Sequence, residues 1–381
     1  MGLFAMNTTI EHIRATSLRG RPVPPVDDLV DVSKGEPDFD TPARIIDSMA
    51  DALRSGYTHY PDPQGDPELR ALLASQLSES SAVDFTAADV LVTHGGSAGL
   101  MAAIFAVLSP GDRVVVPEPT YSLYADVVEL AGGVVDFVPL TVDNQLDFDL
   151  LEQKLPGARL LVICNPGNPT GAVFPKADLE RLATVLDGTD TLLLSDEAYE
   201  KFSFDAPFTS ALAVPGLAER TLYVQTFSKT YAMTGWRLGY VAAPSELVPG
   251  LLFMHRTMNS GVNSAAQRAA ITALHMGTGA YADMVDAFRK RRDFVSERLA
   301  QIPGVQHTIP QGAFYTFFSY PQDRPSEDMR LEFAARGVSL RAGAEYGPGG
   351  EGRLRLSFAT DMASLALALD RIELGIKEIE G

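Results

Sequence analysis

The segment RLLVICNPGN, residues 159–168, joins a run of aliphatic side chains directly to a polar turn. Residues 191–194 and 221–225 have the same character, and they lead into the polar segments 195–197 and 226–229. Short, wholly apolar runs of this kind predict strands that are buried on both faces, as in a parallel sheet. Because ligands of open α/β sheets bind beyond the carboxyl ends of the strands, we expect the three polar segments to converge on one site.

The regions around these strands extend the pattern. Predicted helices at 97–108, 121–130 and 176–186 alternate with the apolar runs, which is typical of parallel strands joined by crossover helices. Beyond about residue 280 the pattern changes, since a charged helix at 281–301 precedes two short apolar stretches. The predicted fold class is α/β, with a mostly parallel, doubly wound sheet and a smaller α+β unit. We expect a large domain at 46–279, a small C-terminal domain at 280–381, and an N-terminal segment, 1–45, that packs with the small domain.

Composition excludes several functional classes. The net charge of −18 and the pI near 4.7 repel phosphate backbones and anionic lipids, so we expect no nucleic-acid or membrane partner. The longest apolar run, 99–108, is far shorter than a membrane span. The single cysteine, Cys164, excludes an internal disulfide and fits a cytoplasmic protein. The six histidines are scattered without the spacing of metal ligands, so no metal site is expected.

Lys229 is the residue with the clearest chemical potential. A lysine after a strand is usually solvated, but one that is buried beside another cation loses its proton more easily and becomes a nucleophile toward aldehydes. Arg237 supplies such a cation, and Thr226 and Ser228 add hydroxyl donors. The glycines of 95–97 open a predicted helix whose free N–H groups can hold an anion, so the whole set describes a phosphate-binding cup.

Asp196 ends a strand of leucines, where an unpaired carboxylate is costly to bury. A cationic partner is therefore expected. Two alternatives remain open: a salt bridge to a nearby Arg or Lys, or a pyridinium nitrogen that the carboxylate keeps protonated. Tyr199 and Asn168, at the same predicted edge of the sheet, could donate hydrogen bonds to a phenolate oxygen on such a ring.

Five motifs together carry a family resemblance. They are, in chain order, GEPDFDTP (35–42), NPGNPTG (165–171), SDEAY (195–199), SKTYAMTGWRLGY (228–240) and RLRLSFA (353–359). Over about residues 30–375 the chain resembles the fold-type I, pyridoxal-phosphate-dependent aminotransferases of class I/II, and most closely their aspartate and aromatic branch. The resemblance implies pyridoxal 5'-phosphate as cofactor, amino acids and 2-oxo acids as substrates, and a homodimer with shared active sites.

The resemblance also assigns roles to residues of the large domain. Lys229 matches the lysine that forms the Schiff base, Asp196 matches the partner of the pyridine nitrogen, and Tyr121 matches the aromatic that stacks on the ring. Asn168 and Tyr199 match the residues that hold the ring hydroxyl. The phosphate-binding positions are Gly95, Gly96, Ser97, Thr226, Ser228 and Arg237.

Other assignments lie outside the large sheet. Arg355 matches the arginine that grips the substrate α-carboxylate, which suits the bidentate geometry of a guanidinium. Gly35 matches a backbone position against the same carboxylate, and Asn168 also lies beside it. Tyr60 matches a tyrosine that reaches the phosphate bound by the neighbouring subunit. These residues imply ping-pong transamination, in which Lys229 takes and returns the α-proton.

Some alternatives remain open at this point. The same cup and lysine serve fold-type I lyases and cyclases, because the cofactor supplies the reactivity and the pocket selects the bond. A regulator that uses the fold as a ligand sensor would need a DNA-binding domain, for which the acidic chain offers little room. Arg341, in LRAGAEYGPGG, either pairs with the distal carboxylate of an acidic substrate or is a solvated strand end, and the second is favoured.

Overall fold

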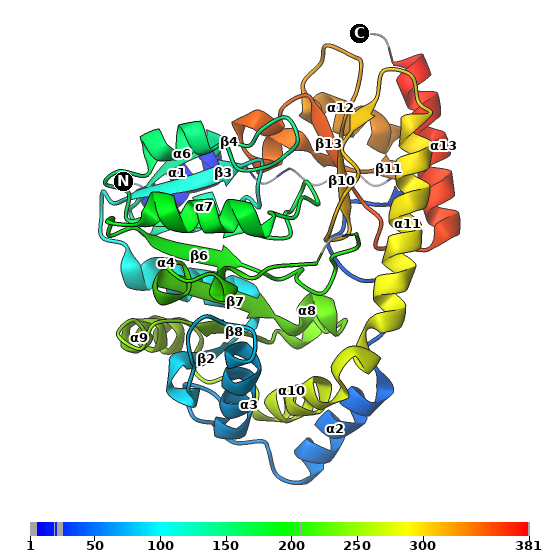
Figure 1. The fold of residues 1–381 in the computed structure, drawn as a ribbon. Helices are drawn as coiled ribbons and strands as arrows, with labels where there is room; N and C mark the ends of the chain where they lie inside the picture. The colour runs from blue at the N-terminus through cyan, green and yellow to red at the C-terminus, as the bar shows by residue number, and fades with distance from the viewer. Residues whose placement is uncertain (1–5, 19, 21–25, 206, 380–381) are drawn as a thin grey trace.

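A computed structural model describes residues 6–18, 20, 26–205 and 207–379. Figure 1 shows a large central sheet with helices on both sides and a smaller sheet beside it. The helix α11 (Ala282–Ala300) runs along one side of the molecule, from the end near α10 (Ser264–Met276) up to the small sheet. In the described part of the chain, no helix combines the length and the apolar character that crossing a membrane requires.

The large sheet has seven strands in the order β2-β8-β7-β6-β5-β3-β4. Their bounds are β2 (Val90–Thr93), β3 (Arg113–Glu118), β4 (Val134–Pro139), β5 (Leu160–Cys164), β6 (Leu192–Asp196), β7 (Thr221–Thr226) and β8 (Gly239–Ala242). β3, β4, β5, β6 and β7 pair in parallel, whereas β8 runs antiparallel to both of its neighbours. The α/β class with a mostly parallel sheet is thus confirmed.

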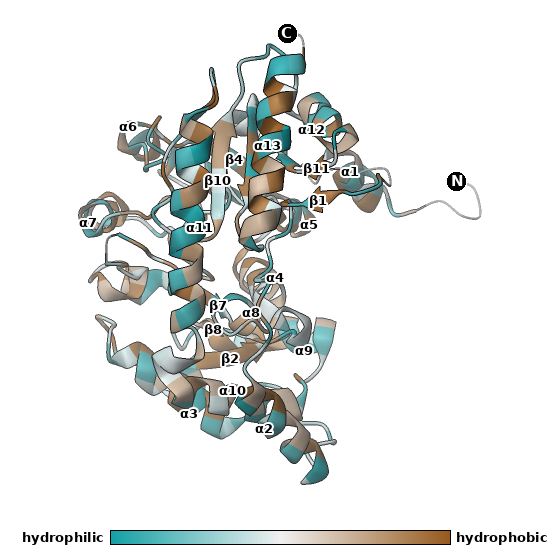
Figure 2. Ribbon diagram, turned by 90° about the vertical axis from the view of Figure 1, so that its right-hand side faces the viewer, coloured by the Kyte–Doolittle hydropathy of each residue, from teal (hydrophilic) through white to brown (hydrophobic). Residues whose placement is uncertain are grey.

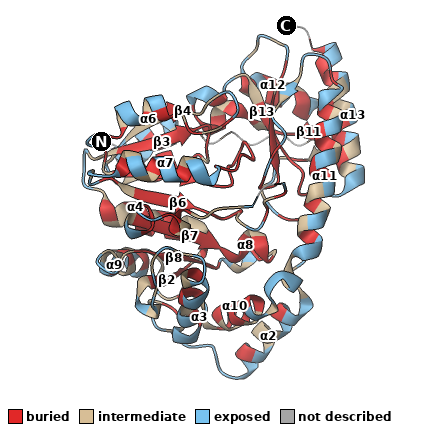
Figure 3. Ribbon diagram, in the orientation of Figure 1, coloured by how far each residue is buried: buried red, intermediate tan, exposed pale blue. Residues whose placement is uncertain are grey.

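Both faces of this sheet are covered, which is why its strands read as continuous apolar runs. Val114 and Val116 pack toward one face, under α4 (Gly95–Val107), α5 (Leu123–Leu130) and α9 (Val248–Asn259). Val115, between them, packs toward the other face, under α6 (Phe148–Lys154) and α7 (Lys176–Leu186). On that face, α2 (Ala43–Arg54), α3 (Pro67–Ser78) and α10 cover β2 and β8. Figure 3 shows the strands of this sheet as largely buried, apart from the edge strand β4, where only Val138 is buried.

The small sheet is antiparallel, in the order β12-β13-β10-β9. Its strands are β9 (Gln306–His307), β10 (Tyr315–Ser319), β12 (Arg341–Ala342) and β13 (Arg353–Ser357). It shares one core with α11, α12 (Ser326–Ala335) and α13 (Met362–Glu378). Figure 2 shows hydrophilic and hydrophobic residues alternating along α11 and α13, as expected for helices with one buried face.

The N-terminal region is joined to this unit through β1 (Val30–Asp31), which pairs in parallel with β11 (Val338–Ser339). The short helix α1 (Thr8–Thr16) lies against α5, on the side of the large sheet. The residue boundaries proposed above for the three units stay a prediction. The strand ends of the large sheet that carry the polar segments face the small sheet, and the space between them holds the site.

Candidate active site

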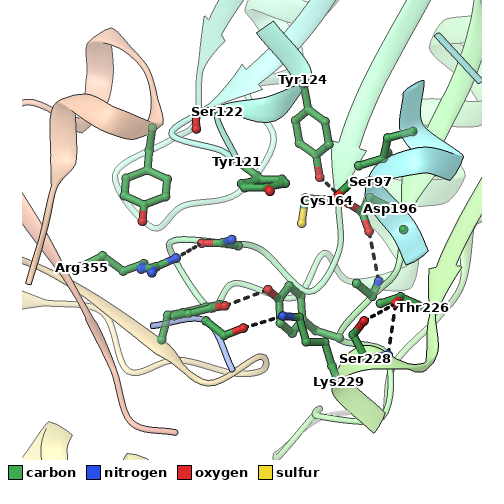
Figure 4. A pocket seen from close by; sticks show the side chains of 18 of the residues that line it. Ser97, Tyr121, Ser122, Tyr124, Cys164, Asp196, Thr226, Ser228, Lys229 and Arg355 are labelled. Carbon is green, nitrogen blue, oxygen red and sulfur yellow. Dashed lines mark hydrogen bonds between the residues drawn. The ribbon is translucent and has the colours of Figure 1, made fainter. Parts of the chain in front are cut away.

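A cavity of about 400 Å³ lies where the carboxyl ends of β5, β6 and β7 meet the small sheet. This is the location expected for a ligand of an open α/β sheet, and the volume suits a small cofactor with a substrate. Side chains from both units line it (Figure 4). The lining residues discussed below are Lys34, Gly35, Gly96, Ser97, Tyr121, Tyr124, Cys164, Asn168, Asp196, Tyr199, Thr226, Ser228, Lys229, Arg237, Tyr315, Arg341, Glu345, Tyr346 and Arg355.

Lys229 lies in α8 (Phe227–Thr230), a short helix that follows β7 directly. The Thr226 hydroxyl accepts the backbone N–H of Ser228 and so caps this helix. The Lys229 ammonium donates a hydrogen bond to the carbonyl oxygen of Gly35. Burial lowers the pKa of Lys229 to about 8, and the cations Arg355 and Arg237 contribute in the same direction. The cavity therefore holds an amine that deprotonates more readily than an ordinary lysine.

Asp196 lies at the end of β6, where it is 7% exposed and lines the cavity. One carboxylate oxygen accepts a hydrogen bond of 2.7 Å from the Tyr124 hydroxyl, and the other accepts the backbone N–H of Ala198 at 3.2 Å. Burial raises the pKa of Asp196, although both hydrogen bonds and the nearby Lys229 act in the opposite direction. Figure 4 shows Tyr124 pointing at this carboxylate.

Of the two alternatives left open for the partner of Asp196, the structure does not support a salt bridge to an Arg or Lys of the described chain. Among the residues that the structure describes, none forms an ion pair with it within 4.0 Å. The carboxylate is instead hydrogen-bonded by Tyr124 and a backbone amide. These neutral donors satisfy part of its hydrogen-bonding capacity but do not neutralise its charge. A buried carboxylate that faces a cavity in this state still favours a cationic ligand.

An anion-binding cup lies beside Lys229. The helix α4 begins at Gly95, and no side chain caps it, so its first N–H groups are open to a ligand. Gly95 has a φ of +75°, which favours glycine, and a Cβ built there would come within 2.7 Å of a guanidinium nitrogen of Arg237. The Thr226 hydroxyl donates to the Ser228 hydroxyl at 2.8 Å, and both line the cavity. One cation, two hydroxyls and free amides are the groups that recognise a phosphate.

Arg355, on β13, enters from the small sheet. Its guanidinium donates to the side-chain oxygen of Asn168 at 2.9 Å and to the backbone oxygen of Ser33. Its Nε is buried without a hydrogen-bond acceptor, and within the described chain Arg355 has no carboxylate partner. The rings of Tyr315 and Tyr346 lie 4.2 and 5.2 Å from its guanidinium carbon. This guanidinium is held in place by neutral groups, so its charge is available to an anionic ligand.

Two tyrosines connect the two units across the cavity. The hydroxyls of Tyr199, after β6, and Tyr315, on β10, are 2.8 Å apart. Tyr121 lies in the turn before α5, and its ring meets the ring of Tyr124 edge-on with centroids 5.7 Å apart. In Figure 4 the Tyr121 ring lies between Arg355 and Asp196, which approach from opposite sides.

The structure brings nearly all of the predicted site residues to this cavity. Those that line it are Gly35, Gly96, Ser97, Tyr121, Asn168, Asp196, Tyr199, Thr226, Ser228, Lys229, Arg237 and Arg355. Gly95 lies immediately behind the cup, against Arg237. Tyr60 is not part of the cavity of its own chain, and 93% of its surface is exposed.

Among the lining residues that sequence reasoning missed are Tyr124, Tyr315, Glu345 and Tyr346. Tyr124 offered a weak signal, since it stands at the start of a predicted helix after a strand. Tyr315 lies within a short apolar stretch and Tyr346 within the segment that follows Arg341, and neither position carries a local signal of a site. Arg341, for which a solvated strand end was favoured, instead lines the cavity and forms an ion pair with Glu345.

An α/β fold with an activated lysine, a buried acid and two anion sites around one cavity defines an enzyme that handles amines and carboxylates. The chain belongs to the aminotransferase class I and II family, whose model matches residues 27–372. It is therefore an aminotransferase, and enzymes of this family depend on pyridoxal 5'-phosphate.

Individual relatives agree with this placement over nearly the whole chain. The chain is 36% identical to an aspartate aminotransferase of Pinus pinaster, covering 94% of this chain and 76% of that relative. It is 35% identical to an arginine–pyruvate transaminase of Pseudomonas aeruginosa, covering 93% and 92% of the two chains. The solved structure of an aromatic aminotransferase from Pyrococcus horikoshii superposes with a TM-score of 0.89 at 35% identity, covering 93% and 97%.

Proposed function

We propose that this chain binds pyridoxal 5'-phosphate in the cavity and moves the α-amino group of an L-amino acid to a 2-oxo acid. The observation that carries the proposal is the joint presence of Lys229 and Asp196, an amine and an unpaired buried acid that face the same space. Lys229 follows β7 and Asp196 ends β6, and these two strands are neighbours in the sheet. Both groups are therefore held by rigid elements.

The residues present fit the cofactor at each of its polar ends. The cup of Arg237, Thr226, Ser228 and the α4 amides suits the phosphate, and Asp196 suits a protonated ring nitrogen. Asn168 and Tyr199 reach the side of the cavity where a ring hydroxyl would need donors. Tyr121 offers a ring face on which a planar cofactor can stack.

Bound there, the cofactor would supply an aldehyde for exchange of amino groups and a ring that accepts electrons from the substrate Cα. Lys229 then acts as the proton carrier. With a pKa near 8 rather than the usual 10.5, a larger share of its amine is neutral at physiological pH and can take the α-proton. It would then give a proton back as a general acid within the same half-reaction. Because the first 2-oxo acid leaves before the second one binds, the two half-reactions give ping-pong kinetics.

The other residues bind and orient the reacting groups. Asp196 would hold the protonated ring nitrogen, and the hydrogen bond from Tyr124 favours the ionised form of that carboxylate and holds it in place. Arg355 binds the substrate α-carboxylate, and its hydrogen bond to Asn168 fixes the plane of the guanidinium. Gly35 brings its backbone against the same carboxylate and already accepts from Lys229. The relatives named above act on aspartate, arginine and aromatic amino acids, so the proposal leaves the amino donor to be determined.

We also propose a cytoplasmic homodimer with shared active sites. Tyr60 is almost fully exposed and lies outside its own cavity, as expected for a side chain that reaches the phosphate in the partner subunit. Phe253 on α9 and Ile46 on α2 are large apolar side chains that are likewise exposed, and a dimer interface would cover such groups. The free, buried thiol of Cys164 suits a reducing compartment.

A donor screen tests the proposed activity. The holoprotein is incubated with acidic, aromatic, branched and basic L-amino acids, each with pyruvate, with 2-oxoglutarate and with no acceptor. Transamination predicts that at least one donor yields its 2-oxo acid only when an acceptor is present, with one new amino acid formed for each 2-oxo acid. If a 2-oxo acid accumulates catalytically without an acceptor, the chain is a lyase and the proposal is wrong.

A further inference from the structure

Arg341 stands directly beside the arginine that binds the α-carboxylate. In the antiparallel pair of β12 and β13, Arg341 is the register partner of Arg355. Residues directly opposite each other in such a pair project from the same face of the sheet, with their Cβ atoms about 5 Å apart. Both side chains line the cavity. Arg341 therefore lies where a substrate held by Arg355 projects its own side chain toward the small sheet.

The charge of Arg341 is already matched. Its guanidinium lies 2.9 Å from a carboxylate oxygen of Glu345. The Glu345 side chain is only 5% exposed, whereas that of Arg341 is 37% exposed. The second oxygen of Glu345 accepts the backbone N–H of Ala342 at 3.1 Å, within the turn η6 (Gly343–Tyr346). Glu345 is thus anchored by the backbone and by burial, and it cannot swing away from Arg341 without leaving a buried charge unpaired.

Lys34, which also lines the cavity, is paired with an acidic residue as well. Within the described chain, the cationic residues that line the cavity are Lys34, Lys229, Arg237, Arg341 and Arg355. In the proposed function, Lys229 and Arg237 serve the cofactor, and Arg355 binds the α-carboxylate. Lys34 lies 3.3 Å from Asp31. The two lining cations that the proposed function leaves unused, Arg341 and Lys34, thus each have an acidic partner.

We propose that Glu345 neutralises Arg341, so that the enzyme prefers amino donors with uncharged side chains over dicarboxylic donors. This inference rests on the proposed function. A second carboxylate placed against Arg341 would lie within a few ångströms of Glu345 as well, and that repulsion offsets the attraction. An uncharged side chain is neither attracted by Arg341 nor repelled by Glu345, and it leaves the ion pair between them intact.

Three variants separate the two charges. Glu345→Gln keeps an oxygen for the Ala342 N–H but leaves Arg341 as an unmatched cation, so the preference should shift toward acidic donors. Arg341→Gln removes the ion-pair partner of Glu345 and should shift the preference toward uncharged donors. In each case the ratio of kcat/KM for aspartate to that for alanine should change by about tenfold, as expected for one uncompensated charge at a partly exposed site. The double variant, which is neutral again, should return to within about threefold of the wild type.

The experiment measures this ratio for the wild type and the three variants as holoproteins, together with the ratio of dissociation constants for succinate and butyrate, which do not react. Cofactor absorbance and the thermal midpoint confirm that each variant is loaded and folded. A wild-type preference for alanine, opposite shifts in the single variants and recovery in the double variant support the inference. A wild-type preference for aspartate above tenfold, or a Glu345→Gln ratio within about twofold of the wild type, overturns it. Failure to turn over any donor would instead overturn the proposed function, and the succinate-to-butyrate ratios would still decide the role of the pair.

Discussion

The two sides of the cavity are built differently. We call the strand ends with Asn168, Asp196, Thr226 and Lys229 the floor, and the small-sheet residues Tyr315, Arg341, Glu345, Tyr346 and Arg355 the roof. Each floor residue ends a parallel strand or comes shortly after one, so a short stretch of sequence both makes the strand and supplies the side chain. The roof residues come from separate antiparallel strands and a turn, and only their register brings them together. In the proposed function, the floor carries the groups for bond chemistry and the roof carries the groups for substrate recognition.

The largest expected effect is on the floor. Lys229→Ala should lower kcat by at least about 10³-fold, because it removes the amine that carries the α-proton. Binding of the cofactor should persist through the cup. The measurement is a single-turnover half-reaction with the best donor, and Lys176→Ala, an exposed lysine on α7, is the matched control. Turnover within tenfold of the wild type in the Lys229 variant would contradict the assigned role.

The free energy of unfolding should also depend on pH, because of a buried histidine close to the cup. His255, on α9, is fully buried, and its Nε2 accepts the backbone N–H of His94 just before the cup. Burial, with a smaller contribution from His94, lowers the pKa of His255 to about 4. The unfolded chain binds this proton near pH 6.5 and the folded chain does not, so the free energy of unfolding should fall as the pH drops from about 6.5 to 4, by up to about 3 kcal/mol.

Urea unfolding at pH 7.5, 6.0 and 5.0 measures this effect, with His255→Gln as the comparison. The glutamine does not titrate, so the variant should lose less stability than the wild type over the same interval. Parallel pH profiles for the two proteins would show that His255 does not contribute.

On the roof the expected change is in binding. Arg355→Leu should raise KM for the amino donor by about a hundredfold, because two charge-assisted hydrogen bonds to the α-carboxylate are lost. The effect on kcat should be smaller, in contrast to Lys229→Ala. Arg355→Lys keeps the charge without the bidentate geometry and should fall between the leucine variant and the wild type. If kcat of Arg355→Leu falls by a larger factor than its KM rises, the assignment of the roof to substrate binding is contradicted.

The smallest expected effect concerns the link between the two sides. Tyr315→Phe removes the hydroxyl that lies 2.8 Å from that of Tyr199 and leaves a buried hydroxyl without this partner. The free energy of unfolding should fall by about 1 kcal/mol, with kcat/KM within a few fold of the wild type. A double-mutant cycle with Tyr199→Phe should give a coupling energy of similar size. Additive effects would show that the hydroxyl pair does not couple floor and roof.

Much of the fold and the floor could be predicted from the sequence because local pattern and structure coincide there. The helix predicted at 176–186 is observed as α7 with the same bounds, and α4 opens at the glycines that were expected to open a helix. The strand predicted to end at Leu194 instead continues to Asp196. Polarity suggested an earlier end, but Ser195 donates to Glu197 and Asp196 accepts from Tyr124, so both polar side chains are satisfied inside the sheet.

The rest depended on contacts that no local pattern reveals. Tyr124 and Asp196 are separated by 72 residues, and Tyr199 and Tyr315 by 116. Arg341 faces Arg355 only because of the register between β12 and β13. β12 has only two residues, so its pairing cannot be predicted from a local sequence pattern. The role of Arg355 could be named from the family motif alone, and the pairing of Arg341 with Glu345 became visible only in the fold.

The account depends most on Lys229 as the residue that holds the cofactor covalently. Borohydride reduction of the holoprotein, followed by proteolysis and peptide mapping by mass spectrometry, tests this directly. The account predicts the pyridoxyl group on the peptide that contains Lys229 and on no other lysine. A modification at a different lysine, or a holoprotein that remains unmodified after reduction, would contradict it.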